Sequence, residues 1–376
     1  MEWKECQIKD VCRLINGRAY SNDEMLEHGK YKIVRVGNLS GGNSTWFYSD
    51  LELPEDKYCH NGDLLFAWAC TFGPHIWKED NTIFHYHIWK IVEDKNVVDR
   101  RFYYYYLKYA TGGFLGALNG SVMVHITKAS MEKMNIKIPK NLDDQRRIAS
   151  ILSSLDRKIE LNNKINADLE EMAQAIFKNW FVDFEPFKDG KFVDSELGMI
   201  PEGWKVGLLG ELCNFKRGKN LLTKNAIDEG VPVVAGGLEP SCYHNVANTG
   251  APVITVSGSG ANAGFMRMYH VPVWASDCSF IDISCENFYF VYCFLKVNSK
   301  LLKHAQTGAV QPHVKPSDIH DFELVIPDKE SIYDFQDKVK PFFDKIASIQ
   351  KENSRLSLLR DTLLPRLMSG EIEVPE

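Results

Sequence analysis

The sequence contains no run of apolar residues long enough to cross a bilayer, for which about 20 are needed. Its first ten residues, MEWKECQIKD, are charged and lack the apolar stretch of a signal peptide. Cysteine is scattered and odd in number, with nine residues and no CxxC pair, which disfavours a disulfide framework and a zinc site. We therefore expect a cytoplasmic protein without a membrane segment.

Signatures of catalysis are missing as well. There is no NPPY- or DPPY-like tetrapeptide of the kind used in adenine methylation, no P-loop, no DEAD-type box and no convincing PD…(D/E)xK arrangement. The stretch VSGSGANAG (256–264) fails as a GxGxxG phosphate loop because Ala263 occupies its sixth position. His85 and His87 would share one face of a strand, but no third metal ligand accompanies them. We expect no catalytic residue, no cofactor site and no metal site in this chain.

The composition provides enough apolar material for packed cores, at 44% hydrophobic and 25% charged residues, which argues against disorder. At about 150 residues per domain, a chain of 376 residues predicts two or three domains. The formal net charge of −6 does not by itself indicate a nucleic-acid binder.

The two halves of the chain repeat each other. WKECQIKDVCRLINGR begins at Trp3 and WKVGLLGELCNFKRGK begins at Trp204, and the two stretches match without a gap. Each half also closes on an Ile-Pro pair, at Pro139 and at Pro327. The stretches between these ends align poorly. Matching ends around divergent middles indicate one scaffold that carries two different binding surfaces, although duplication followed by drift would leave a similar pattern.

A helical tract follows each Ile-Pro pair. In the first tract, seam positions recur at alternating steps of four and three from Ile148 to Trp180, which is a heptad pattern. The same steps run from Phe335 to Leu367, each position 187 residues after its counterpart (148 to 335, 180 to 367). The pattern predicts that the two helices pair with each other, the alternative being that each folds back onto its own half. The predicted helix-pairing residues are Leu155, Ile159, Asn162, Asn166, Leu169, Ile176, Ile346, Ile349, Asn353, Leu356 and Leu363.

Asparagine occupies three of these seam positions. A buried amide weakens the packing of a coiled coil but fixes its register, because a slipped pairing leaves the amide unsatisfied. If the helices run antiparallel, Asn162 or Asn166 should lie near Asn353, close to a pseudo-two-fold axis.

The second tract departs from the heptad pattern at several positions. Arg360 falls on the seam, and Leu359 is expected to help fill the gap beside it. Pro341 and Pro365 predict a less regular helix. From Ile148 to Trp180 the first helix should be roughly 50 Å long at ~1.5 Å per residue, which suits a spacer.

Two long stretches resemble a known family. DDQRRIASILSSLDRKIELNNKINADLEEMAQAIFKNWFVDFEPFKDGKFVDSELGMIPEGWKV (143–206) resembles the central conserved region of type I restriction-modification specificity subunits, and DFQDKVKPFFDKIASIQKENSRLSLLRDTLLPRLMSGEIE (334–373) is similar to their distal conserved region. The resemblance implies an α+β fold with two repeated α/β target-recognition domains, separated by two long antiparallel coiled-coil helices in a pseudo-two-fold arrangement. The expected parts are recognition domains at 1–140 and 204–328, spacer helices at 141–184 and 329–370, and a linker at 185–203.

The same resemblance implies a non-catalytic subunit of a larger complex. Each recognition domain would read one half of an asymmetric, bipartite site in double-stranded DNA. The helices would set the gap between the half-sites and dock two methyltransferase (modification) subunits, and restriction (motor-nuclease) subunits could join. S-adenosylmethionine, ATP and Mg are then expected only on partner subunits. Two other classes stay open, a structural two-domain protein-interaction adaptor and an enzyme that uses the cleft between its domains.

Candidate DNA-binding residues follow the first strand of each half. The candidates for phosphate contacts are Arg18 in the first half and Arg217, Lys219 and Asn220 in the second. A solvent-exposed turn without a ligand explains these residues equally well.

Base reading is expected farther along each half. Arg35 and Asn38 suit guanine and adenine respectively, and their counterparts, Gly236 and Leu238/Glu239, differ as two half-sites would require. Two aromatic stretches, RFYYYYLKYA (101–110) and NFYFVYCFLK (287–296), could stack bases but are better explained as buried helices. The remaining candidates are polar residues in small-residue loops or matched positions near the domain ends, where a packed histidine is equally plausible: Ser257, Ser259, Asn262, His125, Gln311 and His313.

Overall fold

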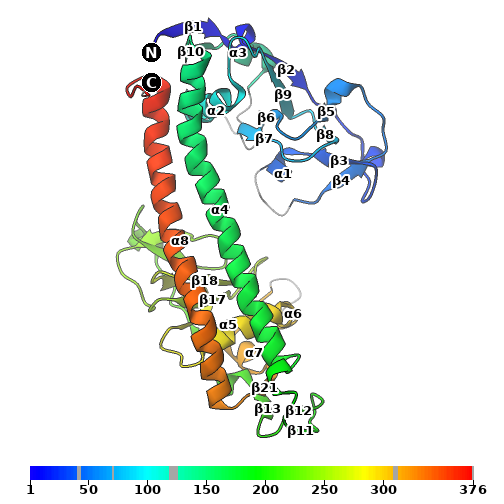
Figure 1. Cartoon of the computed structure of the whole chain (residues 1–376), viewed down its shortest axis with the longest axis vertical. Helices are drawn as coiled ribbons and strands as arrows, with labels where there is room; N and C mark the ends of the chain where they lie inside the picture. Colours follow the sequence, from blue (N-terminus) through cyan, green and yellow to red (C-terminus); the bar gives the residue numbers. More distant parts are fainter. Residues whose placement is uncertain (40–43, 70–71, 118–125, 308–311, 375–376) are drawn as a thin grey trace. The chain divides into compact units, whose positions relative to one another are not determined.

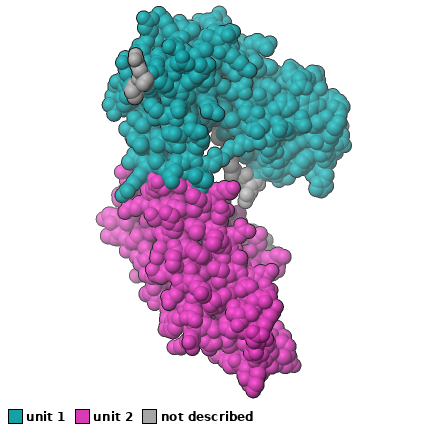
Figure 2. All heavy atoms as spheres, viewed as in Figure 1, with its two compact units in different colours: residues 1–161, 353–376 teal, residues 162–352 magenta. Residues whose placement is uncertain are grey.

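The chain divides into two compact units in a computed structural model that describes residues 1–39, 44–69, 72–117, 126–307 and 312–374. Unit 1 consists of Met1–Leu161 together with Asn353–Glu376, and unit 2 is the continuous stretch Asn162–Glu352 (Figure 2). Two long helices, α4 (Leu142–Phe181) and α8 (Lys329–Ser369), each contribute to both units (Figure 1).

Unit 1 contains two four-stranded sheets and a two-stranded pair. In the pair, β1 (Trp3–Gln7) runs antiparallel to β10 (Asn135–Pro139), so the opening and closing stretches of the first half are ladder neighbours. The first sheet has the order β2-β9-β6-β7, formed by β2 (Cys12–Asn16), β9 (Ile88–Glu93), β6 (Leu64–Ala67) and β7 (Gly73–Ile76). The second has the order β4-β3-β8-β5, formed by β4 (Phe47–Ser49), β3 (Tyr31–Val34), β8 (Thr82–Phe84) and β5 (Tyr58–Cys59). The helices are α1 (Val36–Leu39), α2 (Arg100–Ala117), α3 (Lys128–Glu132), and the 3-10 turns η1 (Ile8–Asp10), η2 (Asn22–Glu24) and η3 (Glu55–Lys57).

Unit 2 repeats this plan. Its terminal pair consists of β13 (Lys205–Leu208) and β21 (Glu323–Ile326), again antiparallel. One sheet has the order β14-β20-β17-β18, formed by β14 (Lys216–Arg217), β20 (Cys278–Asp282), β17 (Val253–Ser257) and β18 (Met266–Tyr269). The other has the order β16-β15-β19, formed by β16 (Cys242–His244), β15 (Val231–Val234) and β19 (Trp274–Ala275). The remaining elements are α5 (Phe288–Val297), α6 (Ser299–His304), α7 (Pro316–His320), the hairpin of β11 (Phe192–Val193) and β12 (Ile200–Pro201), and the 3-10 turns η4 (Glu185–Phe187), η5 (Leu209–Glu211) and η6 (Thr223–Asn225).

The strand ladders confirm the internal repeat. β3 pairs antiparallel with β4 and parallel with β8, and β15 pairs antiparallel with β16 and parallel with β19. Because Val34 lies opposite Phe84 and Val234 lies opposite Ala275, Arg35 corresponds to Ala235. The sequence-based match of Arg35 with Gly236 is therefore wrong by one residue. The divergent middles of the two halves contain too few shared residues to fix the alignment there.

Equivalent caps begin the two long helices. The side-chain oxygen of Asn141 accepts a hydrogen bond from the Asp143 N–H (2.9 Å), and that of Asp328 accepts one from the Ser331 N–H (2.8 Å). Each of these contacts satisfies one of the N–H groups that a helix N-terminus leaves unpaired. Both helices then begin one residue later, which confirms the predicted offset of 187 residues (142 to 329).

The long helices run antiparallel within unit 1. Ile148 and Leu152 of α4 are buried in one core with Leu367 of α8, and Asp156 pairs with Arg360 at 2.7 Å. Asp156 neutralises Arg360 on the seam. The expectation that Leu359 fills the gap is wrong, because 46% of this residue is exposed.

The helices also run antiparallel within unit 2. The rings of Phe177 and Phe181 on α4 lie 5.6 and 5.2 Å from Phe335 on α8, while Asn162 donates a hydrogen bond to Glu352 at 2.9 Å. Asn353 belongs to unit 1, so its proximity to Asn162 stays a prediction.

The remaining seam positions are buried to different degrees. Among the described residues, the Oδ1 atom of Asn166 is buried without a hydrogen-bond partner, which is the cost expected of a seam asparagine. The helix α8 continues without a break through the exposed Pro341 and Pro365, although these prolines predicted a less regular helix. Ile346 and Ile349 are buried, and the partly buried predicted pairing residues are Leu155, Ile159, Asn166, Leu169, Ile176, Asn353, Leu356 and Leu363.

The aromatic stretches form the buried helices that the sequence favoured, α2 and α5. Each helix directs one tyrosine to a carboxylate on α4. The Tyr105 hydroxyl donates to Asp156 at 2.6 Å, and the Tyr292 hydroxyl donates to Glu170. These two contacts, which we call the tyrosine clasps, attach the sheet-bearing part of each unit to its share of the helix pair.

Candidate nucleic-acid interface

In each unit, the loop that carries the first candidate DNA-binding residues begins at a glycine. A Cβ atom on Gly17 would overlap the backbone carbonyl of His85, and one on Gly218 would overlap the backbone carbonyl of Ser276. Only glycine allows the chain after β2 and β14 to pass so close to the neighbouring backbone. This requirement explains why the glycine recurs in both halves.

Arg18 is held by its own loop in unit 1. Its guanidinium forms hydrogen bonds of 3.0 and 2.6 Å with the Glu24 carboxylate and lies 5.2 Å from the centre of the Tyr20 ring. Because Glu24 neutralises its charge, Arg18 would contribute less to phosphate binding than an unpaired arginine.

Arg35 and Asn38 are adjacent but have different roles. The Arg35 guanidinium lies over the Phe47 ring at 5.1 Å and is partly exposed. The Asn38 side chain accepts a hydrogen bond from the Arg35 N–H (3.0 Å) and donates one to the Ser44 carbonyl (3.3 Å). Backbone groups therefore use the Asn38 amide, which shapes the loop and leaves Arg35 as the better base reader of the two.

An aromatic cluster lies beside these loops, and the sequence gave no sign of it beyond the His85-x-His87 spacing. The Trp68 ring lies 5.1 Å from His87 and 6.3 Å from Tyr86, and its indole N–H donates to the Tyr86 carbonyl (2.9 Å). The cluster borders a cavity of about 370 Å³ that Asn16 also lines. Burial, helped by the neighbouring His87 and Arg35, lowers the pKa of His85 to about 4. A neutral His85 is consistent with a packed side chain at neutral pH.

Unit 2 brings three residues from separate segments together at the corresponding place. The Arg217 guanidinium pairs with one carboxylate oxygen of Asp277, and the Ser259 hydroxyl donates to the other. Lys219 and Asn220 follow in the chain with exposed side chains. Sequence reasoning selected all of these except Asp277, which lies 60 positions from Arg217 and in no recognisable motif.

The other loop candidates of unit 2 differ in accessibility. Ser257 is buried and its hydroxyl donates a hydrogen bond to the Gly236 carbonyl (3.2 Å), which makes it a poor candidate for a DNA contact. Asn262 is partly exposed in the turn before β18. His313 is also partly exposed and forms backbone bridges to Ser259 and Thr307.

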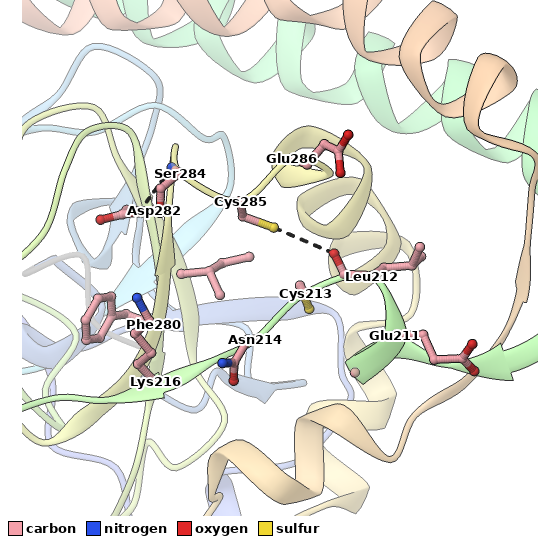
Figure 3. A pocket seen from close by; sticks show the side chains of 12 residues that line it. Glu211, Leu212, Cys213, Asn214, Lys216, Phe280, Asp282, Ser284, Cys285 and Glu286 are labelled. Carbon is pink, nitrogen blue, oxygen red and sulfur yellow. Dashed lines mark hydrogen bonds between the residues drawn. The ribbon is translucent and has the colours of Figure 1, made fainter.

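A separate cavity of unit 2 has the wrong charge for DNA. Figure 3 shows this cavity of about 430 Å³, with the carboxylates of Glu211, Asp282 and Glu286 and the single ammonium of Lys216 among its lining groups. Carboxylates repel phosphate. We therefore place the candidate interface at the Arg217 loops and not at this cavity.

Two candidates, His125 and Gln311, lie outside the described residues. Within the described part of the chain, no helix is long and apolar enough to span a membrane. The same residues contain no group of three or more histidine, cysteine, aspartate or glutamate side chains placed to hold a metal ion.

Comparisons with known proteins identify the family. A family model described as "Type I restriction modification DNA specificity domain" matches residues 1–171 and 201–357. The type I restriction enzyme MjaIX specificity subunit of Methanocaldococcus jannaschii is 30% identical over 76% of this chain and 72% of its own length. The HindI specificity subunit of Haemophilus influenzae is 26% identical over 99% of this chain and 100% of its own. A crystal structure of a type I S subunit from M. genitalium has the same fold, with a TM-score of 0.60, 20% identity, and coverage of 98% of this chain and 96% of that one.

The chain therefore belongs to the type I restriction-modification DNA specificity family. It is a specificity subunit of such a system and is itself non-catalytic, since catalysis belongs to partner subunits. The family resemblance found in the sequence and the predicted mixed α and β fold are confirmed.

Proposed function

We propose that each unit reads one half of an asymmetric, bipartite sequence in double-stranded DNA. The observation that supports this most is the combination of matched ladders with unmatched loops. The two units share their strand pairing, except that the described residues of unit 2 contain no counterpart of β5, yet corresponding loop positions carry different side chains. Side chains at groove edges determine which bases a protein prefers. Two equivalent scaffolds with different loops would therefore read two different half-sites.

The long helices would act as the spacer between the half-sites and as the docking surface for two methyltransferase subunits, with restriction subunits joining the assembly. S-adenosylmethionine, ATP and Mg would bind to those partners. The charge of this chain favours such a division of labour. Its net charge is −6, and Arg18 and Arg217 are each paired with a carboxylate. Because phosphate neutralisation dominates DNA affinity, partner subunits would supply much of the basic surface.

Exchange of one recognition segment tests the proposal. Residues 1–140 are replaced by the same segment of a relative, and the chain is co-expressed with its methyltransferase subunits in a host without other adenine methylation. We expect the methylated sequence to change in one half-site only. Sequencing that maps modified adenines across the genome provides the measurement.

The reciprocal exchange of residues 204–328 is the matched control and should change only the other half-site. A chimera that is folded and supports methylation at the unaltered sequence would contradict the proposal. That result would favour the alternative role as an adaptor whose two domains bind protein.

A further inference from the structure

The paired arginine of unit 2 is positioned more tightly than a phosphate contact requires. Arg217 is at the end of β14, and both oxygens of its partner Asp277 are occupied, one by the guanidinium and the other by the Ser259 hydroxyl. The Asp277 carbonyl also accepts the Gly258 N–H at 3.1 Å. The Gly258–Ser259 segment therefore holds both the backbone and the carboxylate of Asp277, and the carboxylate in turn orients the guanidinium.

Gly258 makes room for this arrangement. A Cβ atom at Gly258 would overlap the Arg217 guanidinium. The backbone at this residue is also constrained, since its carbonyl accepts the Val314 N–H at 3.1 Å. A side chain at position 258 would displace the guanidinium, because the backbone there cannot readily move away.

An arginine neutralised by a carboxylate adds little to the electrostatic attraction for phosphate, which depends on net charge. The pairing instead sets the direction of the guanidinium. A guanidinium has five N–H donors in a fixed fork, and the Arg217 side chain remains 45% exposed, so donors are left for a ligand. A planar pair of donors matches the O6 and N7 acceptors of guanine in the major groove.

We infer that Arg217 reads a guanine in the half-site of unit 2, with Asp277 and Ser259 as positioning residues and Gly258 providing the space. This inference rests on the proposed function. It assigns to Arg217 a base contact in place of the phosphate contact that its position after the first strand suggested. Lys219, which is two residues farther along and exposed, takes the phosphate role.

Binding measurements on the assembled complex with methyltransferase subunits test the assignment. A panel of duplexes carries each possible base-pair change in the half-site of unit 2, and affinity is measured at two or more salt concentrations. For Arg217→Ala, we expect discrimination to fall by about 5- to 150-fold at one G·C pair and to stay unchanged at the other pairs, while the Asp277 carboxylate that is left unpaired weakens binding to all duplexes alike. Arg217→Lys should not restore the discrimination, because an ammonium cannot form the two parallel hydrogen bonds.

Lys219→Ala is the matched control. It should weaken binding to all duplexes equally and reduce the salt slope by about one, as the loss of a phosphate contact does. Asp277→Asn should reduce the preference at the same G·C pair as Arg217→Ala, without weakening binding to other sequences. A purely structural role of Asp277 would not select one base pair.

The outcomes separate the inference from the proposed function. If Arg217→Ala lowers affinity for all duplexes equally and reduces the salt slope, Arg217 is a phosphate contact and the inference is wrong. If neither affinity nor discrimination changes at any pair, Arg217 does not contact the DNA and the inference is wrong, whereas the proposed function stands as long as the wild-type complex distinguishes the base pairs of this half-site. A wild-type complex that does not distinguish any base pair in this half-site would overturn both. Thermal unfolding of each variant verifies that the substitutions leave the fold intact.

Discussion

One position of the strand ladder, directly before the shared glycine of each unit, carries an asparagine in unit 1 and an arginine in unit 2. The Gly17 and Gly218 N–H groups donate to the carbonyls of Ile88 and Cys278, which makes these pairs structural counterparts. From that match, Arg217 in unit 2 corresponds to Asn16 in unit 1. The ladder thus keeps the backbone positions and lets the side chains differ.

The difference extends to the partners of that position. Continuing the register along the ladders, Gly258 corresponds to Trp68, and Asp277 to His87. Unit 2 has an ion pair where unit 1 has an indole ring against an imidazole. These loops therefore differ, charged in one unit and aromatic in the other, although the pairing of β2 with β9 recurs as that of β14 with β20, because loop side chains contribute little to the ladder itself.

The largest expected effect is a loss of stability when the glycine shared by the two units, Gly17 or Gly218, is replaced. Gly17→Val should destabilise unit 1, and Gly218→Val unit 2, each by at least about 3 kcal/mol, because the new side chain overlaps a backbone carbonyl that cannot move aside. Hydrogen exchange should show lost protection in the altered unit, and chemical denaturation gives the free energy. Gly112→Ala in α2 is the control, since nothing lies within 4 Å of the added Cβ, and it should gain up to about 1 kcal/mol. A loss below 1 kcal/mol for both valine variants would show that the close approach relaxes.

The tyrosine clasps predict a smaller effect that differs between the units. Asp156→Ala removes the α4 carboxylate that both Tyr105 and Arg360 contact, leaves Arg360 paired only with its neighbour Asp361, and should cost about 1–3 kcal/mol. Since Arg360 belongs to α8, the last part of this helix should lose hydrogen-exchange protection. Glu170→Ala removes the partner of Tyr292 and Lys296, both on α5, and should leave α8 protected. Equal loss of protection on α8 in the two variants would contradict the distinction.

The smallest expected effect is the pH dependence that His85 adds to the stability of unit 1. The N–H groups of His85 and Ser276 donate to Val34 and Val234, so Ser276 is the counterpart of His85 and does not titrate in this range. The pKa of His85 is lowered to about 4, so the unfolded chain binds a proton that the folded unit 1 rejects. Its contribution to stability is present above about pH 6.5 and is lost as the pH falls towards 4.

His85→Ser should therefore flatten the stability of unit 1 between about pH 6.5 and 4, measured by denaturation at a series of pH values. Burial also lowers the pKa of His75 and His87, so some dependence will remain. His304→Ser, at an exposed position of α6, serves as the control. An unchanged slope in the His85 variant would show that this histidine titrates alike in the folded and unfolded states.

The features that the sequence predicted well are the periodic or repeated ones. The 187-residue offset, the two long helices and the buried aromatic helices follow from local patterns that occur twice in the chain. The prediction for Leu359 was wrong because it rested only on the position of Leu359 next to Arg360 in the sequence. The contacts of Arg360 depend on the residues of the partner helix. There, Asp156 satisfies Arg360 directly.

The features that the sequence did not predict depend on register between distant strands. Asp277 meets Arg217 only because β14 pairs with β20, and nothing in either segment indicates the other. Trp68 and Tyr86 were missed for the same reason. The sequence matched Arg35 with Gly236 where the ladders match it with Ala235, which shows how little a divergent stretch constrains an alignment. Here β3 and β8 fix the register through the hydrogen-bonded ladder.

Unit 1 is discontinuous in the chain, and this has a consequence for its synthesis. Residues 162–352 form all of unit 2 and are synthesised before the last segment of unit 1, which begins at Asn353. The core of unit 1 includes the buried Leu367 and Met368, and a Cβ on Gly370 would approach Trp3 Nε1 to 2.8 Å. Domains generally fold as they are synthesised. A chain that ends before Asn353 would therefore keep every residue of unit 2 but lack the segment that packs against Ile148 and Leu152 in the core of unit 1.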